Sequence, residues 1–381
     1  MSPVFSYPNR IPECTVTADN PSDWSDKLPL ENVKNRVLTK VARTKIGIRS
    51  AILKVNLSEQ SRPIGCVAVA KHNCTVNARV RFEGFSGLDF TGTKRFDSTA
   101  AFRAYPILYP MGSGHIEFES KNFFLGTLEE SERKSYNSLT TFYPPSNQMC
   151  QSVRITVTDP VAVDATSSTS VEIAKGAKTF VTSVADSFYS GQYITIYSGA
   201  DMTNFMAGEI SSCVGNTLIL NVSSIGGSGV FSDWKIINGD NFLQIGRIFL
   251  GKVVSPAQGC EFGDFSSYFS DNSEMKQAKG NTKYFRVRPR MRVAYLKLKY
   301  LSRIEALNGF LDSQRELGIF GEILFAKTRP EYVTDGVTNI NLTSDSNHFL
   351  NTFLCTHTEL NAVTDSSPVD FETVIKLEEI V

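Results

Sequence analysis

Two short strand patterns, held apart by a long stretch of chain, constrain this fold more than any other feature. Residues 150–159 are C-Q-S-V-R-I-T-V-T-D, and residues 241–251 are N-F-L-Q-I-G-R-I-F-L-G. Both alternate apolar and polar side chains, which is typical of strands with one buried face. Joined directly they would form a hairpin, but about eighty residues separate them. We therefore expect a β-sandwich with a second domain inserted at a hairpin tip, where few contacts cross and loop entropy grows slowly with length.

The intervening residues 166–238 carry a complete strand pattern of their own. Gly176, Gly191, Gly215 and the run G-G-S-G that starts at Gly226 supply turns between the strands. The predicted strands are Thr169–Ile173, Lys178–Thr182, Gln192–Tyr197, Met206–Cys213, Thr217–Val222 and Ser232–Ile237. This pattern predicts a small inserted β-barrel or sandwich domain.

The rest of the chain predicts a discontinuous outer β-sandwich domain, formed by residues 36–162 and 239–381. Its last part should be a strand–helix–strand segment, with the final strand docked in a sheet. Before it stands an N-terminal arm, residues 1–35, whose many prolines prevent regular structure. Trp24 in this arm either anchors a core or packs on a partner.

One amphipathic helix is expected near residues 302–318. Ser302 and Glu305 match a capping box, and Gly318 matches a helix end. The apolar stripe should pack on the outer sheet; it consists of Ile304, Leu307 and Leu311. The predicted fold class is mainly β, a jelly-roll sandwich interrupted by a small β domain, with this one helix.

Composition excludes several classes of protein. The formal net charge is zero, so no global field draws the chain to nucleic acid or membranes. From the first ten residues and the short apolar runs, we expect neither a secretory leader nor a membrane-spanning segment. The seven cysteines are widely spaced without any C-x-x-C, which suggests reduced thiols made in a cytoplasm.

The sandwich segments resemble galactose-binding-like jelly rolls of the discoidin type. The resemblance rests on V-A-R-T from Val41, A-I-L-K-V-N-L-S from Ala51, R-P-I-G-C-V-A-V-A-K-H-N-C-T from Arg62, A-R-V-R-F from Ala78, V-R-I-T-V-T-D from Val153 and F-L-Q-I-G-R-I-F-L-G from Phe242. It covers most of residues 36–160 and 240–251 and implies a sandwich fold, which can serve recognition or scaffolding.

The whole arrangement resembles a family of tailed-phage tail-tip proteins, including distal tail and baseplate components. In that family the sandwich is followed by a strand–helix segment, here R-M-R-V-A-Y-L-K-L-K-Y-L-S-R-I-E-A from Arg290. The insert also resembles a module common in phage tail proteins. The matching motifs are K-T-F from Lys178, G-Q-Y-I-T-I from Gly191, N-F-M-A-G-E-I from Asn204, G-N-T-L-I-L-N-V from Gly215 and S-I-G-G-S-G-V-F-S-D-W-K-I from Ser224.

No motif singles out an active site or a metal site. His72, His115, His348 and His357 lie far apart, whereas a metal site needs three or four convergent ligands. A G-x-S-x-G elbow is missing, and Gly226–Gly229 lacks the Lys and helix of a phosphate loop. We therefore expect no catalysis, metal or cofactor. A depolymerase stays open, because 39 carboxylates can supply a suitably spaced pair by chance.

A row of basic side chains marks a possible assembly interface. Arg286, Arg288, Arg290 and Arg292 fall on one face of an alternating strand pattern, and Pro289 predicts that the strand lies at a sheet edge. The row either binds phosphate groups or forms a solvated or inter-subunit face paired with carboxylates. With Trp24, these arginines are the expected interface residues.

A second set of side chains in the insert suits sugar recognition, because aromatic rings stack on pyranose rings and amides fix hydroxyls. The candidates are Tyr189, Tyr193, Tyr197, Asn204, Phe205 and Trp234. For Trp234, a place in the core of the insert is favoured over sugar contact.

These observations predict a non-enzymatic structural component of a bacteriophage tail tip or baseplate. The resemblance implies a homo-oligomeric ring, a hexamer, in the virion tail. It also implies assembly in the host cytoplasm, with tube and hub proteins as further partners and no membrane insertion. The alternative is a carbohydrate-binding protein of the virion that recognises a glycan on the host surface.

Overall fold

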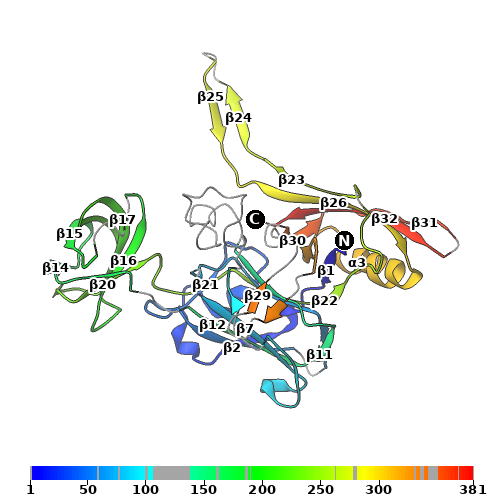
Figure 1. Cartoon of the computed structure of the whole chain (residues 1–381), viewed down its shortest axis with the longest axis horizontal. Helices are drawn as coiled ribbons and strands as arrows, with labels where there is room; N and C mark the ends of the chain where they lie inside the picture. Colours follow the sequence, from blue (N-terminus) through cyan, green and yellow to red (C-terminus); the bar gives the residue numbers. More distant parts are fainter. Residues whose placement is uncertain are drawn as a thin grey trace.

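The computed structural model describes residues 2–57, 60–75, 78–98, 102–105, 138–159, 163–184, 188, 190–261, 263–277, 281–329, 332–334, 339–341, 351–367 and 369–380. Figure 1 shows a β-rich body, a small β unit on its left and a hairpin that projects from its top. The predicted fold class is confirmed: the described chain is mainly β, with a sandwich, an inserted small β unit and a short helix.

One sheet of the sandwich has the strand order β2-β4-β12-β7-β8, and β9 pairs with β7. Its strands are β2 (Thr15–Ala18), β4 (Ala51–Asn56), β7 (Arg79–Phe85), β8 (Lys94–Asp97), β9 (Phe102–Arg103) and β12 (Ser152–Thr158). All of the pairings in this sheet are antiparallel.

The facing sheet belongs to a larger, ten-stranded sheet of order β10-β6-β22-β1-β27-β30-β32-β26-β23, in which β31 also pairs with β32. Its strands are β1 (Val4–Tyr7), β6 (Cys66–Ala70), β10 (Leu139–Phe142), β22 (Arg247–Val254), β23 (Phe265–Ser270), β26 (Met291–Leu301), β27 (Ile323–Ala326), β30 (Thr352–His357), β31 (Val363–Asp365) and β32 (Phe371–Glu379). The predicted docked terminal strand is β32, which lies between β30 and β26.

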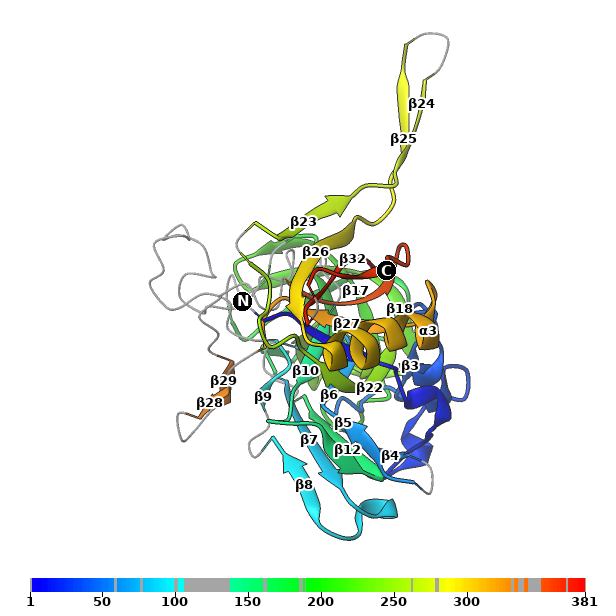
Figure 2. The same ribbon diagram turned by 90° about the vertical axis from the view of Figure 1, so that its right-hand side faces the viewer.

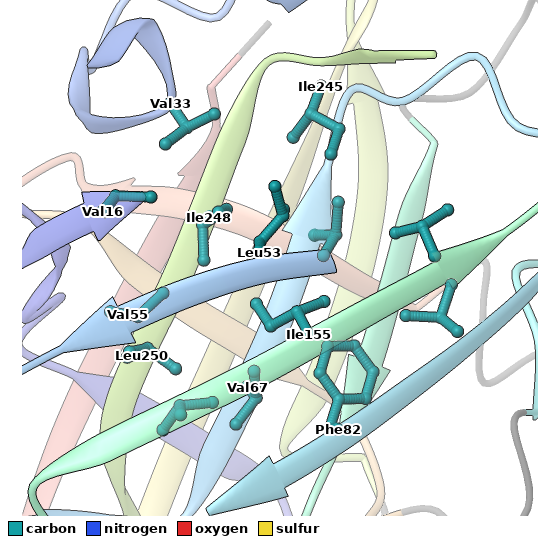
Figure 3. Close-up of a cluster of buried hydrophobic side chains, with 14 of the residues drawn as sticks. Val16, Val33, Leu53, Val55, Val67, Phe82, Ile155, Ile245, Ile248 and Leu250 are labelled. Carbon is teal, nitrogen blue, oxygen red and sulfur yellow. The ribbon is translucent and has the colours of Figure 1, made fainter. Parts of the chain in front are cut away.

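The sandwich core lies between these sheets, as Figure 3 shows. Leu53 and Ile155 come from the first sheet, and Val67, Ile248 and Leu250 come from the second; all are at most 1% exposed. Strands β6 and β22 are buried on both faces, because Ala68 and Phe249 face a second apolar cluster on the other side.

The predicted hairpin between the two split strands is wrong. β12 pairs with β4 and β7, whereas β22 pairs with β6 and β1, so the two strands lie in opposite sheets of the sandwich. Alternation of apolar and polar side chains indicates only that a strand has one buried face. Two strands that face each other across a sandwich core show the same alternation as two strands that pair in a hairpin. The insert therefore interrupts a crossover between the sheets.

The prediction of an irregular N-terminal arm is also wrong. β1 forms ladders with β22 on one side and with β27 on the other. β2 pairs with β4. Trp24 is 5% exposed and belongs to the sandwich core. Prolines do not prevent these short strands, because they stand in the connections, for example Pro8 and Pro21.

The predicted helix is present, and its caps are confirmed. It comprises the π-helical η5 (Glu305–Leu311) and the α-helical α3 (Asp312–Leu317). The amide and hydroxyl of Ser302 donate to Oε2 of Glu305 at 2.8 and 2.7 Å, and Gly318 ends the helix with φ 56°.

The predicted core stripe of this helix is wrong. Ile304 is 73% exposed, Leu311 is 44% exposed and Leu307 is only half-buried. The helix instead buries Phe310 and Leu317 against the C-terminal half of the ten-stranded sheet. A π-helix has more residues per turn than the 3.6-residue period from which the stripe was predicted, so its buried face moves to other positions.

The insert is a closed six-stranded sheet of order β13-β20-β16-β17-β18-β15, and a bridge from Ser167 to Thr182 joins its two edges. Its strands are β13 (Ala165–Ser167), β15 (Gly176–Val181), β16 (Tyr193–Ser198), β17 (Phe205–Val214), β18 (Thr217–Gly226) and β20 (Trp234–Asn238). Two register shifts bend β17, as closure into a barrel requires. The barrel has its own buried cluster, which includes Phe180 and Trp234.

A buried ion pair fastens the root of this barrel. Nη2 of Arg49 lies 2.7 Å from Oδ2 of Asp159, and the two side chains are 4% and 1% exposed. Arg49 also donates from Nη1 to the carbonyl oxygen of Asp240. Asp159 precedes the barrel and Asp240 follows it, so one guanidinium holds the two connections together.

Shorter elements complete the described structure. They are η1 (Ile11–Glu13), η2 (Pro21–Asp23), η3 (Leu30–Lys34), η4 (Leu88–Phe90), β3 (Ala42–Arg43), β5 (Arg62–Ile64), β11 (Gln148–Cys150), β14 (Val171–Glu172), β19 (Val230–Phe231), β21 (Gln244–Ile245), β24 (Glu274–Gln277), β25 (Lys283–Arg286), β28 (Tyr332–Thr334) and β29 (Asn339–Asn341).

Helix packing gives a first prediction. Phe310 is 2% exposed, and its ring meets that of Phe5 edge-on at 5.3 Å. We expect Phe310→Ala to lower the free energy of unfolding by about 3–5 kcal/mol. The matched change Leu311→Ala, on the exposed side, should stay within about 0.5 kcal/mol of the parent. Chemical denaturation measures both, and equal effects would contradict this packing.

The barrel root gives a second prediction. Replacing residues 163–239 by a short Gly/Ser linker should leave a soluble body, because Arg49 already holds Asp159 and Asp240 close together. Ile46 packs on the barrel cluster of Tyr197 and Phe205, so the change is combined with Ile46→Ser. Circular dichroism and the melting curve of the shortened chain test it. An insoluble or unfolded product would count against an autonomous insert.

His357 gives a third prediction, on pH. This side chain is buried in β30, and burial lowers the pKa of its imidazole. As pH falls below the ordinary value of about 6.5, the unfolded chain takes up the proton first. The stability from neutral His357 is therefore present above that pH and is lost as pH falls towards the lower pKa of the folded state. His357→Phe should make Tm fall less on acidification from pH 7.5, and an unchanged fall would refute this.

Candidate functional site

A hairpin that leaves the body of the protein is the most exposed element with its own chemistry. β23 and β26 continue from the ten-stranded sheet into β24 and β25, which pair only with each other. Figures 1 and 2 show β24 and β25 extending away from the remaining strands. Every residue of both strands is exposed. A two-stranded ribbon is only marginally stable in water, so this projecting hairpin (residues 271–290) has the form of an element that docks on something else.

Large apolar side chains line the projecting hairpin and its base. Met275 and Phe285 are directly opposed across the ladder, so they share one face. Tyr284 lies opposite Lys276 on the other face. The exposed fractions are 51% for Tyr268, 56% for Phe269, 53% for Met275, 62% for Tyr284, 62% for Phe285 and 81% for Val287. Such a density of aromatic surface is typical of interaction sites.

The projecting hairpin is strongly basic within a neutral chain. It holds two acidic and six basic residues, a net charge of +4: Asp271, Glu274, Lys276, Lys279, Lys283, Arg286, Arg288 and Arg290. Arg288 pairs with Glu274, and Arg290 lies 3.6 Å from Asp271. Hydrogen bonds from Ser273, and after them Arg290, lower the pKa of Asp271. Among the described hairpin residues, Lys276, Lys283 and Arg286 have no ion-pair partner.

The predicted arginine row does not lie on one strand face. Arg286 ends β25, and Arg288 and Arg290 lie in the extended link before β26. Arg292 is 6% exposed inside β26 and pairs with Glu379 of β32, Nη2 to Oε1 at 2.5 Å. Strand conformation stops at Arg286 and resumes at Met291, which ends the alternation. Further along β26, its ladder with β32 shifts register between Leu298 and Leu301.

The barrel does not bring the predicted sugar-contact residues together on its surface. Trp234 is 1% exposed, packs edge-on against Phe180 and donates Nε1–H to the carbonyl oxygen of Thr169 at 2.9 Å. Tyr197 and Phe205 are buried in a cluster with Ile46.

Two other members of the predicted sugar-contact set keep surface, and one cannot be placed. Asn204 is half-buried, and its amide donates to Asp201 at 3.2 Å. Tyr193 is 37% exposed. Tyr189 lies outside the described residues.

A surface feature that the sequence did not indicate is a hollow beside the helix. Its volume is about 780 Å³, and it is lined by Arg303, Leu307, Asp365, Ser366, Ser367, Val369 and Phe371. The hollow lies between the start of the helix and the turn from β31 to β32. These two segments lie far apart in the sequence and meet only in the folded structure, so no local sequence pattern predicts the hollow.

Reactive groups are scarce in the described part of the chain. No three His, Cys, Asp or Glu residues are grouped there as metal ligands would be. All seven cysteines lie in the described part of the chain, and none of them forms a disulfide. Burial raises the pKa of the Cys14 and Cys150 thiols to about 12, so neither is a thiolate near neutral pH. The described helices include none that is long and apolar enough to cross a membrane.

Comparison with known proteins gives distant likenesses to solved structures. No family model and no curated protein match the chain. A Clostridium perfringens module, CpGH89CBM32-4, is 12% identical with a TM-score of 0.25, covering 40% of this chain and 85% of its own. The family 32 CBM of C. perfringens NanJ, in complex with galactose, is 13% identical with a TM-score of 0.25, over 40% and 86%. A fucolectin from striped bass (Morone saxatilis) serum is 10% identical with a TM-score of 0.24, over 65% and 99%.

The names of these three solved structures describe carbohydrate-binding modules or a lectin. Two of the three align with less than half of this chain. At such identities and TM-scores, the likenesses say nothing about what this chain binds. Its function has to be argued from its own surfaces.

Proposed function

We propose that this chain is a non-enzymatic structural subunit that assembles with copies of itself, and that the projecting hairpin is its docking element. The observation that carries the proposal is the hairpin itself. Its strands are fully exposed, display Met275, Tyr284 and Phe285 to solvent and, among the described strands, pair only with each other. Burying these side chains against a partner removes apolar area from water and supports a ribbon that is marginal alone.

The particular assembly we propose is a ring in a bacteriophage tail tip. Its support is the resemblance in sequence: the strand–helix segment from Arg290 and the motifs of the insert from Lys178 to Ile236. In such a ring each hairpin contacts a neighbouring subunit, and the barrel, attached through Asp159 and Asp240, stands out from the body. Tube and hub proteins would be the further partners.

A variant pair tests the docking role of the hairpin. Phe285→Ser combined with Tyr284→Ser should convert the oligomer to monomer, because truncating an aromatic anchor costs about 2 kcal/mol or more, roughly 30-fold in Kd each. Light scattering after gel filtration gives the mass. Val214→Ser, at a 74% exposed position of the barrel, is the matched control and should leave the oligomer intact.

Two results would contradict this function. One is a parent protein that stays monomeric at the highest concentration at which it remains monodisperse. The other is an oligomer that is unaffected by the hairpin variant. Circular dichroism of each variant shows that the body remains folded.

Carbohydrate recognition is the second candidate. The observation in its favour is the partly exposed ring of Tyr193, the first residue of β16 on the barrel. A glycan array tests it with the parent and with Tyr193→Ala. Binding that Tyr193→Ala abolishes would establish this function for the barrel.

A further inference from the structure

We infer that the projecting hairpin docks on the helix side of a second copy of this chain, where an exposed apolar face surrounds the hollow. This inference rests on the proposed function and names the partner surface. We define the exposed apolar face as Ile304, Leu307, Leu311 and Val369. Exposure reaches 73% at Ile304 and 72% at Val369.

The exposed apolar face needs an explanation, because a helix on a globular protein normally turns its apolar stripe inward. Here the π-helical turns bury Phe310 and Leu317 and leave Ile304 and Leu311 in water. Leu307 from the helix and Val369 from the turn before β32 both line the hollow, so the two segments meet there. Exposed apolar side chains gathered at a hollow are typical of a binding site.

Charge identifies the occupant. Residues 359–380, which include the turn that lines the hollow, contain six acidic residues and one basic residue. Glu379 is buried and pairs with Arg292, and Glu372 pairs with Lys297. Four carboxylates and one lysine are left, a net charge of −3: Glu359, Asp365, Asp370, Glu378 and Lys376. Asp365 lines the hollow and has no ion-pair partner in the described chain. The projecting hairpin carries +4. Two oppositely charged surfaces on a neutral chain attract each other between copies.

Shape and chemistry also match. The hollow is lined by the apolar side chains of Leu307, Val369 and Phe371. Ser366 and Ser367 also line it. It has room for an aromatic ring, and Phe285 and Tyr284 are the exposed rings of β25. Arg303 also lines the hollow, so the hollow itself holds one charge of each sign. The negative balance comes from the strands beside it.

The contact has to be intermolecular. In Figures 1 and 2, β24 and β25 extend away from α3 of their own chain, and Figure 1 shows that they also extend away from β31. The donor surface and the acceptor surface are also different parts of the chain. Such a head-to-tail contact closes into a ring or continues as a filament, whereas a contact of two identical surfaces stops at a dimer.

A mixing experiment tests this arrangement. The donor variant is Phe285→Ser with Tyr284→Ser, which keeps the acceptor surface. The acceptor variant is Ile304→Ser with Val369→Ser, which keeps the hairpin and changes only exposed side chains. We expect each variant to be monomeric by light scattering. Mixed in equal amounts, they should form a complex of two chains and nothing larger, because one good donor then meets one good acceptor.

Controls make the outcomes separable. Val230→Ser, at a 62% exposed barrel position, is the matched control for the acceptor variant and should leave the oligomer intact. If the acceptor variant oligomerises as the parent does while the donor variant is monomeric, the hairpin docks elsewhere: this inference is overturned and the proposed function stands. Monomers that do not combine on mixing also overturn it. A donor variant that still oligomerises overturns the inference and the proposed function together.

Discussion

One strand near the N-terminus makes this protein a single body. β1 donates and accepts along both of its edges, to β22 of the sandwich and to β27 of the C-terminal segment. Without it, the sandwich sheet would end at β22 and the C-terminal sheet at β27, each with a row of open backbone groups. Unpaired edges invite wrong pairing, so a strand from the chain start that closes both is a structural necessity. Its side chains take part too, since Phe5 and Tyr7 enter the C-terminal core and Val4 the cluster on the opposite face.

Buried arginine–carboxylate pairs lie at the seams between the parts. Arg247 of β22 contacts Glu322 before β27 at 2.5 Å and also donates to the carbonyl oxygen of Lys34. Arg292 joins β26 to β32 through Glu379. The third pair, at the barrel root, is Arg49 with Asp159. A buried pair is weak evidence of net stability, because desolvation offsets the attraction, but losing one partner leaves a costly bare charge. These pairs therefore determine how the parts pack together more than they add to the free energy of folding.

Two surfaces remain that these internal contacts do not use. Exposure to water is unfavourable for both the projecting hairpin and the exposed apolar face. An isolated two-stranded hairpin is only marginally stable in water, and the helix exposes apolar side chains that a helix normally buries. The projecting hairpin is basic, the segment 359–380 beside the exposed apolar face is acidic, and the two surfaces lie on different parts of the chain. That combination is what a subunit of a repeating assembly needs, since donor and acceptor are then present once in every copy.

Sequence alone determined the local structure well. Periodicity located five of the six barrel strands, but it placed the first at Thr169–Ile173, whereas the barrel uses β13 (Ala165–Ser167). Ser302 and Gly318 marked the helix ends, and glycines marked the turns of the barrel. These features depend on neighbours in the chain, so local patterns report them. The sequence also predicted a domain inserted between residues 159 and 241, because the strand on each side of it could be recognised.

Tertiary structure alone decided which strands pair and which surfaces stay in water. The alternation of apolar and polar residues in β12 and β22 is the same whether the two strands pair in one sheet or face each other from opposite sheets. Only the tertiary structure shows that they lie in opposite sheets. Trp24 and Arg292 have side chains suited to an interface or an interior, and the packing of distant strands placed both inside. The stripe of Ile304 and Leu311 has the period of a buried face, yet the π-helical turn exposes it. In each case the deciding contacts join residues far apart in the chain, and a local pattern carries no information about them.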